Sequence, residues 1–373
     1  MIRNFFKQCL LALLLATSME QLAIAENPAD PNKILRYVFG AAETGFDPAI
    51  SQDLYSAYVQ QSIFETLFTY DYLARPAKLI PLTAQEMPEV SEDGMIYTIR
   101  LKKGIVFNDD SAFIGKKREL TMNDYIYSFK RLMDPKLASP HTWLFEGKIK
   151  GLDEAIQIAK KTGYFNYDAP IAGLELIDRY TLRIHLKQAD LNLGMILAHD
   201  PTGAVAREVV EKYRDAQGQV MANPVGTGPY QLKQWVRGSR IILEANPNFR
   251  GLTWDFQGGT DPEDQRIVQQ LKGKRMPQIG RIEISIMVED QSRWLSFQND
   301  EIDLFQLDGP LAPRALSGGK LKPELLKKGK GKNLRLCKFL LKSIRSIPKH
   351  DNNVGFGVRI EIFHKYAKKP NLS

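Results

Sequence analysis

The sequence contains very little cysteine and histidine. Cys9 and Cys337 are its two cysteines. We expect Cys9 to be removed with the N-terminal segment, so no intramolecular disulfide can form. The five histidines are His141, His185, His199, His350 and His364, and none of them is spaced from another as zinc or iron ligands are. The fold must therefore depend on an apolar core, and neither a metal nor another cofactor is expected.

Long apolar runs are also missing. The longest, Cys9 to Ala16, falls well short of the roughly 18 to 20 residues that a membrane-spanning helix needs. It follows two basic residues and precedes Ala23-Ile-Ala25, the pattern of a secretory signal peptide with its cleavage site. We expect residues 1–25 to be removed, so that the mature chain begins at Glu26 and leaves the cytoplasm.

Motifs for catalysis are absent from the sequence. There is no G-x-S-x-G nucleophile turn, no phosphate-binding loop of the Walker type, no G-x-G-x-x-G fingerprint and no H-E-x-x-H. Glu301, Asp303 and Asp308 form an acidic cluster, but alternation along a strand places the first two on one face, which is usually solvated. The sequence predicts that the chain has no catalytic residues and is not an enzyme.

The positive charge is concentrated at one end of the chain. The formal net charge is +8, yet residues 330–373 alone contain eleven Lys and Arg against two acidic residues. The rest of the mature chain is slightly acidic and has no basic patch for nucleic acid. Three explanations of residues 330–373 stay open: translation out of frame after about Gly329, a genuine divergent tail, or a basic amphipathic helix that docks on anionic lipid.

Hydrophobic patterning predicts a mixed α/β chain. Alternating or β-branched runs predict strands at 33–39, 97–101, 181–186, 230–236, 241–243 and 281–286. Helical patterns lie between them, at 53–68, 122–133, 152–160, 205–213 and 291–299. Because about 350 residues exceed what one core usually organises, we expect two lobes.

Five short motifs follow one another in a characteristic order. They are Phe46-Asp-Pro48 with Ser62-Ile-Phe-Glu-Thr-Leu-Phe68, Tyr97-Thr-Ile-Arg-Leu-Lys-Lys-Gly104, Thr121 to Arg131 followed by Ala138-Ser-Pro140, Asn223-Pro-Val-Gly-Thr-Gly-Pro-Tyr230 with Asn246 to Gly251, and Ser296 to Asp303. Taken together they resemble the oligopeptide- and dipeptide-binding proteins of bacterial ABC importers, the extracellular solute-binding protein family 5. The resemblance covers roughly residues 33–308.

The resemblance implies a two-lobed periplasmic binding protein fold of type II, with an extra small subdomain in lobe I. Residues 26–68 and 191–287 would form the main subdomain of lobe I, and residues 69–190 the inserted small subdomain. Residues 288–329 would begin lobe II. Family members continue for roughly two hundred residues more, so we expect the second lobe to be incomplete, through truncation or a frameshift.

The resemblance also implies a function and a site. The chain would be a monomeric periplasmic receptor that binds a peptide or another small solute between two lobes and delivers it to an inner-membrane ABC permease. Gln52, Leu54 and Tyr55 would face the ligand, and so would His141, where relatives often carry an aromatic residue. The alternative is that Gln52 only caps the next helix, while Tyr55 and Trp143 only seal contacts between subdomains.

Two functions from other classes compete with this interpretation. One is a secreted hydrolase, and the other is a single-lobe scaffold with a basic membrane-docking tail. A loss of the second lobe would leave a copy that does not function as a receptor. The solute itself stays open, since similar proteins carry dipeptides, longer peptides, haem, nickel chelates and opines.

Overall fold

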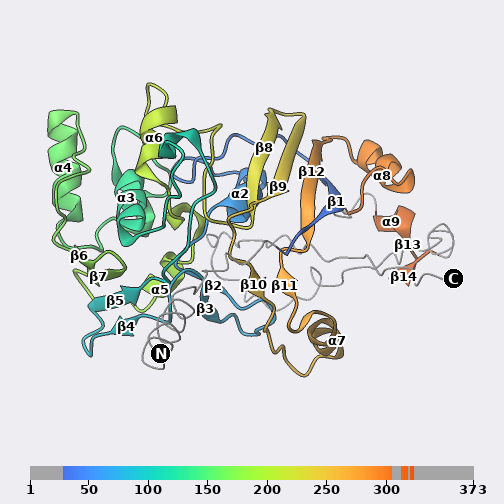
Figure 1. Ribbon diagram of the computed structural model, residues 1–373, viewed down its shortest axis with the longest axis horizontal. Helices are drawn as coiled ribbons and strands as arrows, with labels where there is room; N and C mark the ends of the chain where they lie inside the picture. The colour runs from blue at the N-terminus through green and yellow to red at the C-terminus, as the bar shows by residue number, and fades with distance from the viewer. Residues whose placement is uncertain (1–27, 305–311, 318–319, 323–373) are drawn as a thin grey trace, which may run out of the picture.

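The computed structural model of the chain describes residues 28–304, 312–317 and 320–322 (Figure 1). The predicted signal peptide, the tail 330–373 and Asp308 lie outside the described residues. The described α-helices are α2 (Leu54–Ile63), α3 (Met122–Met133), α4 (Leu152–Thr162), α5 (Leu193–Ile196), α6 (Arg207–Tyr213), α7 (Pro262–Leu271), α8 (Asp290–Gln298) and α9 (Ala312–Ala315). Three short 3-10 helices are η1 (Ser111–Phe113), η2 (Thr142–Leu144) and η3 (Asp200–Thr202).

The first of the two four-stranded sheets combines one strand from the start of the described chain with three strands from residues 230–286. It has the order β1 (Asp30–Phe39), β12 (Ile279–Ile286), β9 (Arg240–Ala245) and β8 (Tyr230–Val236). β1 and β12 run parallel, whereas β12, β9 and β8 are antiparallel. Since β1 and β12 are about 250 residues apart in sequence, only the tertiary fold could show that they pair.

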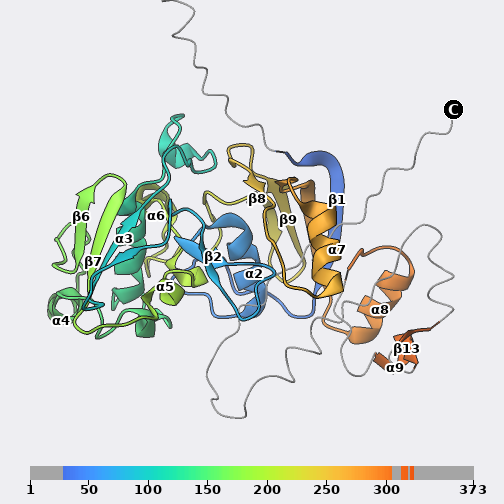
Figure 2. The same cartoon turned by 90° about the horizontal axis from the view of Figure 1, so that it is seen from below.

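The second sheet lies at the other end of the molecule and is built from one continuous part of the chain. Its order is β4 (Glu89–Val90), β5 (Ile96–Arg100), β7 (Thr181–His185) and β6 (Leu174–Asp178), all antiparallel. In both views α2 lies between the two sheets, while α3 packs with the second one (Figures 1 and 2). Two-stranded pairs complete the described strands: β2 (Phe68–Tyr70) with β3 (Leu79–Pro81), β10 (Leu252–Thr253) with β11 (Arg275–Met276), and β13 (Leu316–Ser317) with β14 (Lys320–Leu321).

Two apolar cores accompany the two sheets. The larger core joins α3 and the second sheet, and it includes Tyr97, Phe129 and Leu182, each at most 3 % exposed. The smaller core joins α2 to the first sheet through residues such as Phe39 and Ile284. A third, minor cluster holds α7 against Leu73. The two main cores touch through Tyr167 and Tyr213, which pack against both.

Most predicted elements are present in the structure. The prediction of a helix over 53–68 is wrong at its end, because the chain leaves α2 in an extended conformation at Phe64 and continues into β2. Apolar periodicity continues through residues 64–68 because Phe64, Leu67 and Phe68 are buried, although not as part of a helix. α7 is not among the predicted helices; it begins after Asp261, which accepts a hydrogen bond from the Glu263 N–H at 2.8 Å.

Residues 288–304 remain in contact with the first sheet. After α8 the chain returns alongside β1, where Leu304 bridges Tyr37 in parallel. Arg36 holds this return with two hydrogen bonds to Asp303, at 3.1 Å from Nε and 2.7 Å from Nη2. The Asp303 carboxylate, expected from the sequence on a solvated face, is partly buried and forms an ion pair with Arg36.

Candidate functional site

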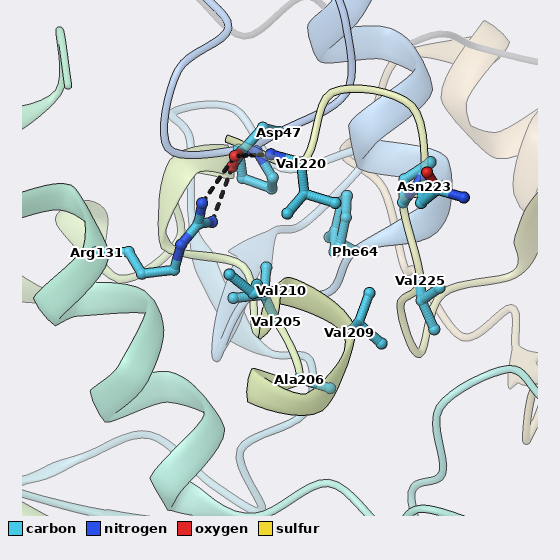
Figure 3. Close-up of a pocket in the computed structure, with 12 residues that line it drawn as sticks. Asp47, Phe64, Arg131, Val205, Ala206, Val209, Val210, Val220, Asn223 and Val225 are labelled. Carbon is cyan, nitrogen blue, oxygen red and sulfur yellow. Dashed lines mark hydrogen bonds and ion pairs between the residues drawn. The ribbon is translucent and has the colours of Figure 1, made fainter. Parts of the chain in front are cut away.

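The loop that follows β1 is fixed by a buried ion pair. Asp47 accepts hydrogen bonds from Arg131 Nη1 at 2.9 Å and Nη2 at 2.8 Å, and both side chains are at most 2 % exposed (Figure 3). The backbone N–H groups of Ala49 and Val220 donate to the same carboxylate. Burial alone would raise the pKa of Asp47, but the charge and hydrogen bonds of Arg131 hold it below its usual value.

The space around this ion pair is too small to hold a solute. The cavity lined by Asp47, Phe64, Arg131 and several valines amounts to about 10 Å³ (Figure 3). One water molecule already needs roughly 10–15 Å³. The Asp47–Arg131 pair therefore has a structural role, which is to fix the loop that leads to Gln52. It also explains why the sequence carries Phe46-Asp-Pro48 together with the basic end of α3.

A second set of contacts joins this loop to η2. The Ser139 hydroxyl donates to the Ala49 carbonyl at 2.6 Å, and His141 Nε2 lies 2.9 Å from the Ser51 carbonyl. Because a carbonyl can only accept, His141 Nε2 must carry the proton. Burial lowers the pKa of His141, so the imidazole is neutral at pH 7. The structure thus brings His141 next to the 51–55 segment, from 90 residues away in sequence.

The three other predicted ligand residues lie at the start of α2. Gln52 is exposed, and Leu54 keeps 45 % of its surface accessible. The alternative that Gln52 caps α2 is wrong, because the cap is Asp53, whose Oδ1 accepts from the Ser56 N–H at 2.7 Å. Tyr55 is partly buried, with its ring centroid 4.6 Å from that of Phe39. Gln52 and Leu54 are therefore available to a ligand, while Tyr55 also belongs to the core edge.

Sequence reasoning missed Gln61, His199 and Asp200, which lie in the neighbourhood of His141. Gln61 on α2 donates through Nε2 to Asp200 Oδ2 at 2.7 Å, and Asp200 opens η3. The ring of Trp143 meets His199 edge-on, with centroids 5.7 Å apart, and 55 % of Trp143 is exposed. His199 and Asp200 carry no periodic or motif signal, since His199 is the N-cap of the short helix η3 and Asp200 is its first residue. Only folding places them next to His141.

A second buried network explains the glycine-rich motif. Glu65 accepts from Arg250 Nη1 at 2.7 Å and Nη2 at 2.9 Å, and the Thr227 hydroxyl donates to it at 2.9 Å. Gly228 N–H donates to the Ile63 carbonyl at 2.8 Å. A Cβ atom on Gly226 would lie only 2.0 Å from that carbonyl oxygen, so glycine is required by close backbone approach. The motif fixes the end of α2, and its first residues Asn223, Pro224 and Val225 line the small cavity beside Asp47.

No group of three or more His, Cys, Asp or Glu side chains among the described residues is arranged to hold a metal ion. Within the same part of the chain, no helix has the length and apolar character to cross a membrane. His141 and His199 lie in one neighbourhood without forming a metal site.

Comparison with known proteins decides the family. The model of bacterial extracellular solute-binding proteins, family 5, matches residues 78–339, well over half of the chain. This chain belongs to that family. The match continues into the basic segment that begins at residue 330. Because the family consists of solute-binding proteins, the prediction that the chain is not an enzyme is confirmed, and a secreted hydrolase is disfavoured.

Curated relatives are similar over part of their length. The periplasmic oligopeptide-binding protein OppA of Salmonella typhimurium is 27 % identical over 274 residues, which is 72 % of this chain and 43 % of that protein. The glutathione-binding protein GsiB of Salmonella choleraesuis is 30 % identical over 57 % of this chain and 34 % of its own length. The chain therefore spans less than half the length of these relatives.

Solved structures confirm the fold. OppA of Listeria monocytogenes bound to peptide superposes with a TM-score of 0.57 at 20 % identity, over 76 % of this chain and 48 % of that one. OppA of Haemophilus influenzae in complex with the peptide RPPGFSPFR gives a TM-score of 0.57 at 20 % identity, over 81 % and 50 %. The chain has the periplasmic binding protein fold and corresponds to about half of these proteins.

Proposed function

We propose that this chain is the periplasmic substrate-binding component of an ABC importer and that it binds peptides, or a similar small solute, for delivery to an inner-membrane permease. Family membership and the likeness of the fold to OppA proteins with bound peptide support this proposal. A cleaved signal peptide over residues 1–25 and a monomeric state belong to the same proposal. Residues 26–68 and 191–287 would form the main part of lobe I, with residues 69–190 inserted and lobe II beginning at about 288.

One observation carries the site proposal. Residues 51–55 and 139–143 are far apart in sequence but lie together in the structure. Ser139 and His141 make the connecting hydrogen bonds, to the carbonyls of Ala49 and Ser51 in the loop that Asp47 fixes. The joined surface presents Gln52 and Leu54 to solvent at the start of α2. Polar and apolar groups held on a rigid support can bind a ligand without losing much side-chain entropy. We infer that Gln52, Leu54, Tyr55 and His141 contact the solute.

Calorimetric titration of the full chain with tri- to pentapeptides tests this proposal. Saturable binding is expected, and Leu54→Ala should weaken it about tenfold, which corresponds to roughly 1.4 kcal/mol. Leu54 is the best probe because it is half exposed, so its loss should leave folding intact.

Ile158→Ala is the matched control, since Ile158 is 61 % exposed on α4 and lies outside the proposed site. Its affinity should equal that of the unaltered chain. The site assignment fails if both variants bind equally well. The function fails if no peptide of any length or charge gives saturable heat while far-UV circular dichroism shows a folded chain.

A further inference from the structure

Asp200 is a carboxylate in a partly buried position that has no cationic partner among the described residues. Its Oδ2 accepts from Gln61, a neutral donor, and no Lys or Arg in the described part of the chain forms an ion pair with it. Buried carboxylates are normally paired, because removing a charge from water costs far more than a neutral hydrogen bond returns. An unpaired carboxylate beside a proposed ligand surface therefore needs a physical explanation.

The groups around Asp200 do not neutralise it. Burial lowers the pKa values of both His141 and His199, which are therefore neutral at pH 7. On the neighbouring helix α3, Lys130 donates to the carbonyls of Tyr167 and Ala169, and Arg131 is committed to Asp47. Burial raises the pKa of Asp200 to about 6, so the group is an anion at neutral pH.

An aromatic ring lies in the same neighbourhood. Trp143 packs edge-on against His199, the residue before Asp200, and keeps more than half of its surface exposed. His199 Nδ1 is buried and has no hydrogen-bond partner among the described residues. A carboxylate and an indole ring both attract cations, the first by charge and the second through the negative face of its π system. Neither attracts an anion.

We propose that Asp200 and Trp143 form a subsite for a positively charged group of the solute, an ammonium or a guanidinium. The inference rests on the proposed peptide-binding function. It adds to that function a preference for positively charged solutes. A bound cation would supply the missing partner of Asp200, and Trp143 would cover its apolar stem. The cation could come from a Lys or Arg side chain or from a peptide amino terminus, which share this chemistry.

Calorimetry on the full chain with four peptides tests the subsite and separates these sources. The probes are Ala-Leu-Ala and Ala-Lys-Ala, each with a free and with an acetylated amino terminus. At pH 7.5 the proposal predicts that at least one cationic group, the Lys side chain or the terminal amine, improves affinity about tenfold or more, as one desolvated charge pair does. Asp200→Asn should abolish that gain and leave the affinity for acetylated Ala-Leu-Ala unchanged.

Asp255→Asn is the matched control, because it removes one carboxylate from an exposed position near β10. It should keep the preference for cationic probes. Lowering the pH from 7.5 to 5 should reduce the preference in the unaltered chain, since protonated Asp200 no longer attracts a cation.

The outcomes separate the two proposals. If acetylated Ala-Leu-Ala binds as well as the cationic probes do, or if Asp200→Asn retains the preference, the subsite is wrong and the peptide-binding function stands. If none of the four probes and no longer peptide binds to the folded chain, both are wrong. The subsite is established if the preference for cationic probes is lost in Asp200→Asn and kept in Asp255→Asn.

Discussion

At the residue scale, the buried carboxylates of the described residues include two contrasting kinds. Asp47 and Glu65 each receive two hydrogen bonds from an arginine, and they hold loops together. Asp200 receives one hydrogen bond from an amide and no cation among the described residues. Paired charges of the first kind fix a structure, whereas an unpaired charge costs stability that binding can recover.

The pH dependence of stability should show this cost. Because the folded-state pKa of Asp200 is about 6, above its ordinary value of 3.8, the folded chain binds the proton more tightly than the unfolded chain does. The group therefore lowers the free energy of unfolding as pH rises from 4 to above 6, by at most about 3 kcal/mol. Asp200→Asn should raise the urea midpoint at pH 7.5 and leave it nearly unchanged at pH 4.

The comparison at two pH values serves as the internal control for that variant. Asp255→Asn should change the midpoint little at either pH, because Asp255 is exposed and substitutions at exposed positions usually alter stability little. An Asp200→Asn variant that is less stable than the unaltered chain at pH 7.5 would show that Asp200 stabilises the fold and would remove the support drawn from its burial.

At the element scale, the glycine-rich turn before β8 determines where α2 ends. Gly226 and Gly228 pack directly on the backbone of Ile63, at the last residue of α2, and Glu65 is tied to Arg250 just beyond it. Helical periodicity alone would extend α2 to residue 68. The chain instead becomes extended at Phe64, because the turn occupies the space that another helical turn would need.

Adding one methyl group to this turn should therefore be costly. Gly226→Ala should reduce the free energy of unfolding by about 3 kcal/mol or more, the upper part of the range for overpacked sites, because the new Cβ would lie 2.0 Å from the Ile63 oxygen. Denaturant titration measures the change. Gly259→Ala is the matched control: its Cβ would come no nearer than 3.8 Å to another atom, and its cost should stay within about 0.5 kcal/mol.

A Gly226→Ala variant as stable as the control would show that α2 and the turn can separate at little cost. The contact would then be too loose to position Gln52 and Leu54. A large loss in the free energy of unfolding would confirm that the turn supports the structure and is distinct from the ligand surface.

At the scale of the whole molecule, the two apolar cores are joined by polar contacts as well as by packing. Arg131, on the helix of the larger core, binds Asp47 in the loop that leads to α2 of the smaller core. Tyr167 and Tyr213 pack against both cores. Residues 28–304 should therefore unfold in one cooperative step, although they contain two separate four-stranded sheets.

Differential scanning calorimetry checks this expectation. One transition is predicted for residues 28–304, with a calorimetric enthalpy equal to the van't Hoff enthalpy. Arg131→Met should lower the midpoint temperature of this transition strongly, because the variant leaves Asp47 buried without its cation. The expected loss in the free energy of unfolding is about 3–5 kcal/mol. Arg207→Met breaks the exposed pairs of Arg207 with Asp168 and Glu211 and should cost about 1 kcal/mol or less. Two separate transitions in the unaltered chain would contradict the expectation.

The sequence by itself determined the α/β class, most helices and strands, the absence of catalytic motifs and the family. These follow from local patterns: apolar periodicity sets the elements, and short motifs with fixed order identify the family. It also selected Gln52, Leu54, Tyr55 and His141 for the site. Only the tertiary structure decided that β1 pairs with β12, that α2 stops at Ile63, and that Asp200, Gln61 and Trp143 gather beside His141. These depend on contacts between residues far apart in the chain, whose partners no local pattern specifies.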